Sequence, residues 1–82
     1  MHSTNESEVK NQVAKYDAEK VGRKLKELRG IRTRIGVSRE TGIPVTTLQG
    51  YEEGTRVPSP DNMICLASYY HTSVQRLFFE HK

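Results

Sequence analysis

The stretch that decides the fold runs Thr41-Gly42-Ile43-Pro44-Val45-Thr46-Thr47-Leu48-Gln49-Gly50-Tyr51-Glu52-Glu53-Gly54, and Arg56-Val57-Pro58 follows it closely. It opens on a glycine turn, continues with a short segment in which Leu48 and Tyr51 share one helical face, and ends on a second glycine. This order predicts a helix over residues 45–52 that follows a tight turn. Two helices joined by a short glycine-containing turn form a helix-turn-helix unit.

Two helices are predicted before the turn. The segment 20–29 has apolar residues at i, i+4 and i+7, which predicts a helix with one apolar stripe made of Val21, Leu25 and Leu28. Thr33 is a suitable N-cap for a second helix over 34–41, and Gly42 then supplies the turn.

Two more helices are predicted after the glycine stop. Arg56-Val57-Pro58 is predicted to be extended, because a residue before proline avoids the helical region. Ser59 and Pro60 suit the cap and first position of a fourth helix, whose apolar positions are Met63, Leu66, Ala67 and Tyr70. After a turn at His71-Thr72, Ser73 caps a fifth helix that carries Val74, Leu77 and Phe78. No segment alternates as a strand does, so the predicted fold is all-α, with five short helices.

The chain has room for one small domain. Residues 1–19 are predicted to be a polar N-terminal extension, flexible or with a short helix over about 7–18 that carries Val9, Val13 and Tyr16. Residues 20–79 are the predicted domain, and residues 80–82 are a tail.

Positive charge is concentrated at one place in the chain. The net charge is +3, but Lys20–Arg39 alone contains eight basic residues and one acidic residue, Glu27. Such a one-sided block repels itself unless it faces an anion. The alternative is that these basic residues form a solvated helix face with no partner. Beside a helix-turn-helix pattern the charge favours neutralisation of DNA phosphates.

Composition excludes several classes of protein. The single cysteine, Cys65, rules out a disulfide framework and a multi-cysteine zinc site, and the three histidines stand at no metal-ligand spacing. No catalytic order of residues and no phosphate-binding glycine loop is found. No apolar run approaches the roughly 18 residues of a membrane span, and no signal peptide is seen. We therefore expect a cytoplasmic protein that is not an enzyme and has no cofactor, metal or membrane partner.

The pattern from Gly42 onward resembles a known family. The residues Gly42-Ile43, Thr47-Leu48, Tyr51-Glu52, Gly54, Arg56 and Pro58-Ser59, followed by Met63, Leu66-Ala67, Tyr70, Ser73 and Leu77, resemble the phage-repressor-like (Cro/repressor, XRE-type) helix-turn-helix family. The resemblance covers about residues 20–79. It implies a compact five-helix, lambda-repressor-like DNA-binding domain with its third helix in the major groove. It also implies a homodimer on a palindromic operator, with half-sites about one helical turn apart.

A recognition helix projects its first turn and its sixth position into the groove. The expected base contacts are therefore Val45, Thr46, Gln49 and Gly50. Gln49 suits adenine, Thr46 offers a hydroxyl and a methyl, and Val45 offers only apolar contact. Gly50 has no side chain, so base recognition there is absent or depends on close backbone approach. We expect DNA shape and phosphates to carry much of the affinity.

Further contacts are expected around this helix. The predicted phosphate contacts are Arg34, Arg39, Thr47, Arg56, Arg23 and Lys24. Glu52, although acidic, is expected to pair with a nearby arginine or a helix terminus. The predicted dimer interface is an apolar cluster on the fifth helix and tail, made of Val74, Phe78 and Phe79. The alternative for Phe78 and Leu77 is that they close the core.

Two other functions fit parts of the sequence. The first is a protein-binding module of the same fold, such as an antitoxin or an anti-repressor partner. The sparse polar readout of the third helix and the acidic extension favour it. The second is a non-specific DNA binder, which fits the charge but not the groove-reading helix. The leading hypothesis is a small bacterial or phage repressor that binds double-stranded DNA as a homodimer, with a regulatory protein partner as the alternative.

Overall fold

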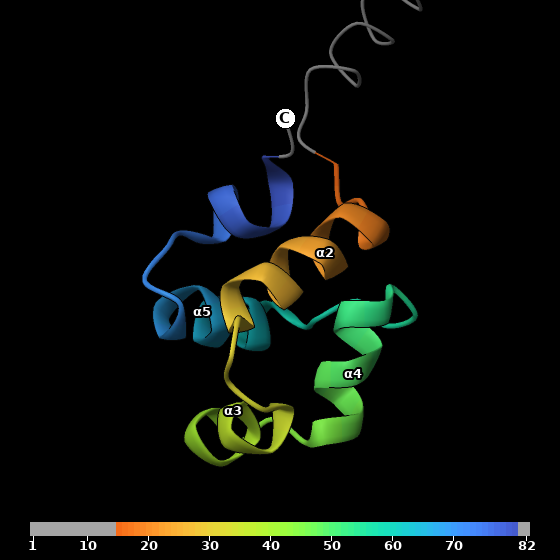
Figure 1. The fold of residues 1–82 in the computed structure, drawn as a ribbon. Helices are drawn as coiled ribbons and strands as arrows, with labels where there is room; N and C mark the ends of the chain where they lie inside the picture. The colour runs from red at the N-terminus through yellow and green to blue at the C-terminus, as the bar shows by residue number, and fades with distance from the viewer. Residues whose placement is uncertain (1–14, 81–82) are drawn as a thin grey trace, which may run out of the picture.

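The computed structural model describes residues 15–80, which form five helices (Figure 1). They are α2 (Ala18–Arg29), α3 (Arg34–Thr41), α4 (Val45–Glu53), α5 (Pro60–Tyr69) and the short η1 (Gln75–Phe79). No strand occurs in this part of the chain, so the predicted all-α fold with five helices is confirmed. The helix expected over about residues 7–18 lies mostly outside the described residues.

The first helix begins earlier than its apolar stripe predicts. Asp17 is the N-cap of α2, and its carboxylate accepts a hydrogen bond from the Lys20 amide at 3.1 Å. A capped first turn extends the helix to Ala18, two residues before the predicted start. The helix ends at Arg29, and its C-cap is Gly30, whose φ of 57° suits glycine. Asp17 therefore belongs structurally to the helix rather than to the extension.

The other helix boundaries follow the predicted caps closely. Thr33 caps α3 by accepting from the Gly36 amide at 2.9 Å, and Ser59 caps α5 by accepting from the Asn62 amide at 3.2 Å. The Ser73 hydroxyl accepts from the Arg76 amide at 3.1 Å. The fifth helix is a single wide turn of π type rather than an α-helix. Local cap chemistry thus determines where these elements start.

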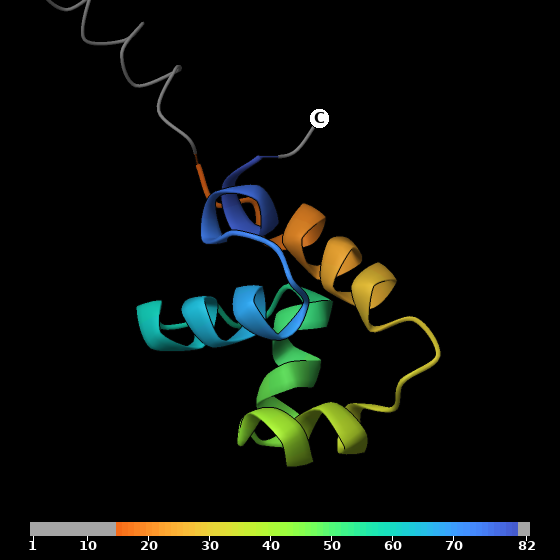
Figure 2. The same cartoon turned by 90° about the vertical axis from the view of Figure 1, so that its left-hand side faces the viewer.

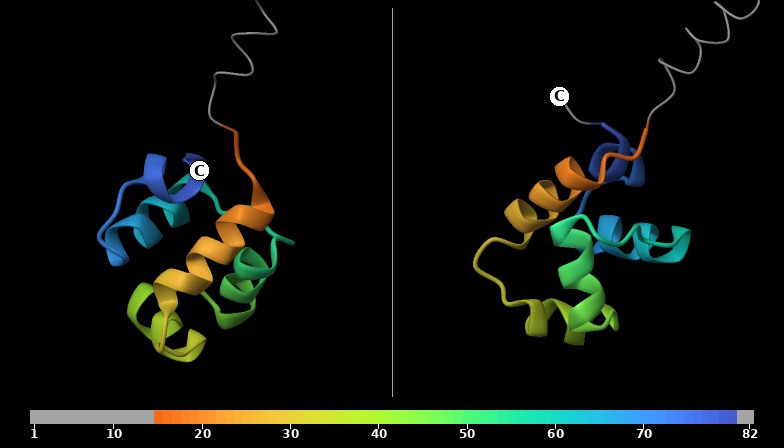
Figure 3. Two further views of the ribbon diagram at one scale, coloured as in Figure 1. Left: turned by 45° about the horizontal axis from the view of Figure 1, so that its top comes forward. Right: turned by 90° about the vertical axis from the view of Figure 1, so that its right-hand side faces the viewer.

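The core is formed by buried side chains from α2, α3, α4, α5 and η1, together with Ile43 of the turn before α4. Figure 2 shows α4 crossing between α3 and α5, and the two views of Figure 3 show η1 beside α2. The fully buried large side chains are Phe78, Leu66, Leu77, Val21 and Val37. None of the helices between residues 15 and 80 has the length and apolarity needed to cross a membrane.

The helices α2 and α4 approach each other closely at Gly22. A Cβ atom built on Gly22 would lie 2.3 Å from the carbonyl oxygen of Glu52 and 3.1 Å from that of Tyr51. Only glycine allows the two backbones to approach this closely. The position of α4 relative to α2 therefore depends on a residue with no side chain.

Tyr16 packs onto the domain from the segment before α2. Its ring stacks on Phe78 at a centroid distance of 6.3 Å and meets Phe79 edge-on at 6.3 Å. Its hydroxyl is buried and has no hydrogen-bond partner among the described residues. Burial, and then the neighbouring Tyr51, raise the pKa of Tyr16 to about 12. The ring of Tyr16 thus packs against both Phe78 and Phe79 within the same chain.

We expect Tyr16→Phe to leave the domain as stable as before or to stabilise it by up to about 1 kcal/mol, because a buried hydroxyl without a partner is unfavourable. The native pKa of Tyr16 lies above the ordinary value of 10.0, so this residue's contribution is fully present below pH 10 and is lost as pH rises toward 12. The variant should therefore show a shallower alkaline loss of stability. Urea unfolding at pH 7 and across pH 9–12 tests both effects, and a loss above about 1 kcal/mol at pH 7 would show that the hydroxyl has a partner.

Candidate nucleic-acid interface

The turn between α3 and α4 is built by short-range hydrogen bonds. Gly42 ends α3 in the left-handed region at φ 80°, and its amide donates to the Ser38 carbonyl at 2.8 Å. The Thr41 hydroxyl donates to the Val37 carbonyl at 2.8 Å and accepts from the Ile43 amide at 3.2 Å. Ile43 is buried, so the turn is anchored to the core. These contacts fix the angle at which α4 leaves α3, as a helix-turn-helix requires.

One face of α4 is turned to solvent. Thr46, Gln49 and Glu53 are exposed, whereas Leu48 and Tyr51 are buried as the sequence predicts. Val45 and Thr47 lie at the edges of this face and are half-buried. We call Thr46, Gln49 and Glu53 the exposed stripe of α4. It contains two of the four predicted base-contact residues, and a third lies at its edge.

Gln49 does not point freely into solvent. Its side-chain amide donates a hydrogen bond to Glu53 Oε2 at 3.0 Å, one helical turn later. The bond holds the amide nitrogen toward Glu53 and leaves Gln49 Oε1 and the second N–H available. An available oxygen and N–H on one amide are what adenine recognition in the major groove requires.

Gly50 does not face outward. It is buried, and the side chain of Arg56 lies across it: a Cβ on Gly50 would be 2.8 Å from both Cγ and Cδ of Arg56. The expectation that Gly50 itself contacts a base does not fit this geometry, because the arginine side chain separates its backbone from solvent. The sequence pattern alone showed a missing side chain and not the residue that covers the gap.

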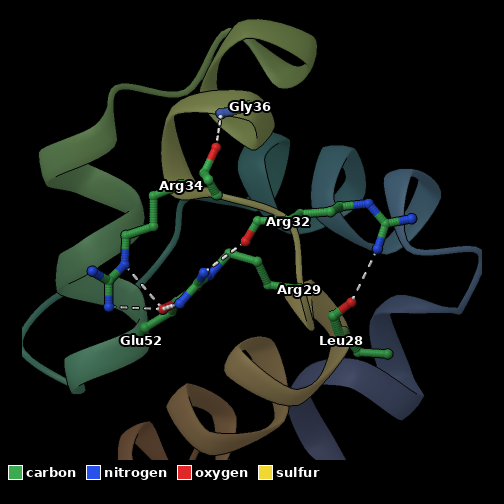
Figure 4. Close-up of polar contacts among 7 residues, drawn as sticks. Leu28, Arg29, Arg32, Arg34, Gly36 and Glu52 are labelled. Atoms are coloured by element: carbon green, nitrogen blue, oxygen red, sulfur yellow. Dashed lines mark hydrogen bonds and ion pairs between the residues drawn. The ribbon is translucent and has the colours of Figure 1, made fainter.

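Glu52 links three helices through a buried ionic contact (Figure 4). Its side chain is 5% exposed and binds Arg29 of α2 through two hydrogen bonds, Nε–Oε2 at 2.7 Å and Nη2–Oε1 at 3.0 Å. Arg34 of α3 contacts the same carboxylate through Nε and Nη2, at 3.1 and 3.0 Å from Oε1. The expected pairing of Glu52 with an arginine is therefore found, and two arginines bind the same carboxylate.

The ionic contact also affects neighbouring groups. The hydrogen bond to Glu52 raises the pKa of Arg29, and burial followed by the Glu52 charge raises the pKa of Tyr70 to about 12. Arg29 further donates from Nη1 to the Arg32 carbonyl at 2.8 Å, which holds the loop between α2 and α3. The arrangement fixes the start of α3 and the end of α4 relative to α2, and so orients the exposed stripe.

The predicted phosphate-contact residues divide into two groups. Arg34 is committed to Glu52, and the Lys24 ammonium donates to the carbonyl oxygens of Arg76 at 2.8 Å and Glu80 at 3.5 Å. Lys24 therefore stabilises the end of η1, at the opposite end of the molecule from α3 (Figures 1 and 2). The expected contact of Lys24 with a phosphate does not fit this geometry, because its ammonium already donates hydrogen bonds to the carbonyl oxygens at the end of η1. Among the predicted phosphate contacts, three arginines are exposed and have no ion pair with another described residue: Arg23, Arg39 and Arg56. Thr47 is half-buried at the edge of the exposed stripe.

The predicted dimer residues differ in accessibility. Phe78 has no exposed surface, so it closes the core and offers nothing to a second copy. Val74 and Phe79 are partly buried, and Phe79 lies against Tyr16. The most exposed apolar side chains lie elsewhere and were not singled out from the sequence: Ile31 at 103%, Val57 at 63%, Ile64 at 60% and Ile35 at 56%. Ile31 directly follows Gly30, the C-cap of α2, so its position after a helix-ending glycine was the available signal.

No cluster of three or more metal-ligating side chains occurs among the described residues. The geometry that is present, a short turn joining two helices with one face of the second helix exposed, defines a helix-turn-helix domain. The family model that matches this chain is described as helix-turn-helix and covers residues 23–77. The chain therefore belongs to the XRE-type, repressor-like helix-turn-helix family.

One solved structure supports this assignment in three dimensions. The crystal structure of the DNA-binding domain of BldD superposes with a TM-score of 0.63 at 25% sequence identity. The match covers 82% of this chain and 99% of that domain. No protein with a curated description matches the chain.

Proposed function

We propose that this DNA-binding regulator is a transcriptional repressor that acts in the cytoplasm and binds a palindromic operator in double-stranded DNA as a homodimer. The observation that carries the proposal is the exposed stripe of α4, held at a fixed angle by the turn after α3 and by the Glu52 contact. A helix presented in this way fits the major groove. The protein acts by binding and not by catalysis.

Each residue on or beside the exposed stripe of α4 has a role in this proposal. Thr46 and Gln49 contact base edges, with Gln49 reading adenine through the amide that Glu53 orients. Val45 contacts a thymine methyl, and Thr47 contacts a phosphate at the edge of the groove. α4 itself has no basic residue, and Glu53 adds a negative charge to its exposed stripe, so electrostatic attraction to phosphates comes from the neighbouring elements.

Unpaired positive charge supports the same proposal. Arg23 and Arg39 are exposed and have no ion pair in the described residues, so both are available for phosphates. Arg39 lies in the last turn of α3, close in sequence to the turn that precedes α4. Phosphate contacts position the protein on the duplex and make its affinity depend on salt.

The test is a selection from a random double-stranded DNA library near physiological salt. We expect enrichment of a two-fold symmetric motif with half-sites about one helical turn apart. Enrichment of a single unpaired half-site would contradict the homodimer and retain the DNA-binding regulator. Absence of any enrichment would contradict sequence-specific regulation.

Variants of exposed residues separate the two kinds of contact. Gln49→Ala should flatten the preference at one base pair per half-site, by about 1–3 kcal/mol of discrimination, and leave other positions unchanged. Arg39→Ala should instead weaken all sequences about equally and reduce the salt slope by about 1. Affinity measured on the selected operator and its single-base variants at several salt concentrations distinguishes these results. Equal effects of the two variants on every sequence would contradict base recognition by Gln49.

A protein-binding function is the second candidate, and the exposed isoleucines favour it. Ile31 is fully exposed in the loop before α3, and Ile35 is exposed in the first turn of α3. Two large apolar side chains in one short segment suit contact with a regulatory partner such as a toxin or anti-repressor. Tight binding to the product of a neighbouring gene, together with no DNA enrichment, would favour this function over the first.

A further inference from the structure

Arg56 and Gly50 form a packed pair beside the exposed stripe of α4. Gly50 lies inside the helix, and its backbone is not in the left-handed region that favours glycine. Backbone conformation therefore does not require glycine at this position. The space above it does, because a Cβ there would lie 2.8 Å from Cγ and Cδ and 3.2 Å from Cβ of Arg56.

The backbone holds Arg56 in this place. The Gly50 carbonyl accepts hydrogen bonds from the Thr55 amide at 2.9 Å, the Arg56 amide at 3.2 Å and the Thr55 hydroxyl at 3.3 Å. The chain reverses at Gly54, at φ 78°, and returns along the end of α4 (Figure 1). The arginine side chain therefore starts from a fixed point on the helix, and a Cβ on Gly50 would have to displace it.

The position of this pair on the helix matters for DNA. Residues four apart are neighbours on a helix surface, so Gly50 adjoins Thr46 of the exposed stripe. The stem of Arg56 thus borders the surface that enters the groove in the proposed function. Its guanidinium has no hydrogen bond or ion pair among the described residues, and Arg56 is exposed.

We propose that Arg56, laid across Gly50, supplies the side chain that the sixth position of α4 lacks, and that it contacts a guanine edge in the major groove. Arginine binds guanine O6 and N7 through two hydrogen bonds, the commonest specific contact to a base. Gly50 is then a positioning residue, because its lack of a side chain lets Arg56 reach the groove. This inference rests on the proposed function and identifies a specificity-determining residue for it.

A double-mutant cycle on operator binding tests the pair. The variants are Gly50→Ala, Arg56→Ala and the double variant, measured on the selected operator. We expect each single variant to weaken binding on the order of tenfold or more, and the double variant to be no weaker than Arg56→Ala. Independent effects that multiply in the double variant would overturn the positioning role of Gly50.

Base recognition is tested with single-base variants of the operator. Arg56→Ala and Arg56→Lys should both flatten the preference for guanine at one position per half-site, because lysine cannot form the paired hydrogen bonds. A uniform loss on every sequence, with Arg56→Lys close to wild type, would overturn the base contact and identify a phosphate contact. Arg23→Ala is the comparison for a phosphate contact: it removes an exposed arginine of α2, so it should weaken all sequences about equally and leave the base preference unchanged.

Stability measurements separate misfolding from lost recognition. Alanine is the better helix former, so Gly50→Ala destabilises only if Arg56 obstructs its methyl group. Urea unfolding should therefore show a loss of stability for Gly50→Ala that the additional Arg56→Ala change removes. If the double variant is not rescued in this way, the packed pair is overturned.

Failure of the wild type to select any DNA would refute the proposed function. Selection of a motif whose guanine preference survives Arg56→Ala would refute this inference alone.

Discussion

Gly22→Ala should destabilise the domain by about 3 kcal/mol or more, because the new methyl group meets backbone and not a movable side chain. Its Cβ would lie 2.3 Å from the Glu52 carbonyl oxygen, so α2 and α4 must separate. Separation disturbs the core between Val21, Leu48 and Tyr51. A small domain has only about 5–15 kcal/mol of stability, so this loss approaches the point at which folding fails.

Thermal and urea unfolding measure the effect, and a fall in Tm on the order of 15 °C is expected for a domain of this size. Gly36→Ala is the matched control, since it places the same methyl group in another helix. There the nearest atom is the Thr33 hydroxyl oxygen at 3.2 Å, a side chain that adjusts. The control should change stability by no more than about 1 kcal/mol. Alanine is the better helix former, whereas its methyl group crowds the Thr33 hydroxyl that caps α3, so the two effects oppose each other. Similar losses for both variants would contradict the close approach at Gly22.

Glu52→Ala is the second variant with a large expected effect. Removal of the carboxylate leaves Arg29, whose side chain is 17% exposed, with an uncompensated positive charge, and it leaves Arg34 unpaired beside it. Breaking a buried ionic contact by deleting one partner destabilises by about 3–5 kcal/mol. We expect urea unfolding of this variant at pH 7 to show a loss in that range.

The three partners should differ in a defined order. Arg34→Ala should be the mildest change, because Glu52 keeps both hydrogen bonds to Arg29 and the Arg34 side chain is 30% exposed. Arg29→Ala should be intermediate, and Glu52→Ala the most severe. A Glu52→Ala loss below about 1 kcal/mol would show that the contact behaves as a surface ion pair. The DNA affinity of the folded fraction should also fall, since α3 and α4 lose their common anchor.

The helices were predictable because their signals are local. Thr33 and Ser59 each cap a helix within three residues of themselves, and the Ser73 hydroxyl accepts from the Arg76 amide just before η1. Gly42 and Gly54 end helices by adopting positive φ. Periodic apolar residues identified the buried faces, including Leu48 and Tyr51 of α4. The start of α2 was misplaced by two residues, since the apolar stripe begins at Val21 while the cap stands at Asp17. The wide turn of η1 had no local signal.

The candidate interface was only partly predictable. The exposure of Thr46 and Gln49 follows from helical periodicity once Leu48 and Tyr51 are buried. The fate of the basic residues does not follow from periodicity, because an arginine or lysine on a helix surface has no preferred partner in its own sequence. Lys24 hydrogen-bonds a carbonyl 52 residues away, and Arg34 binds a carboxylate 18 residues away. Neither side chain is therefore free to bind a phosphate, and in both cases the partner lies outside the residue's own local segment.

The sequence by itself determined the order and ends of the helices, the turn that makes the helix-turn-helix, and the faces of each helix that avoid water. Caps, glycine conformations and apolar spacing act over a few residues, so they are present in the chain before it folds. Only the tertiary structure decided that Glu52 joins Arg29 and Arg34, that Gly22 brings α2 against α4, and that Arg56 covers Gly50. Those contacts depend on the distance and angle between whole helices, which are set when the elements pack around one core.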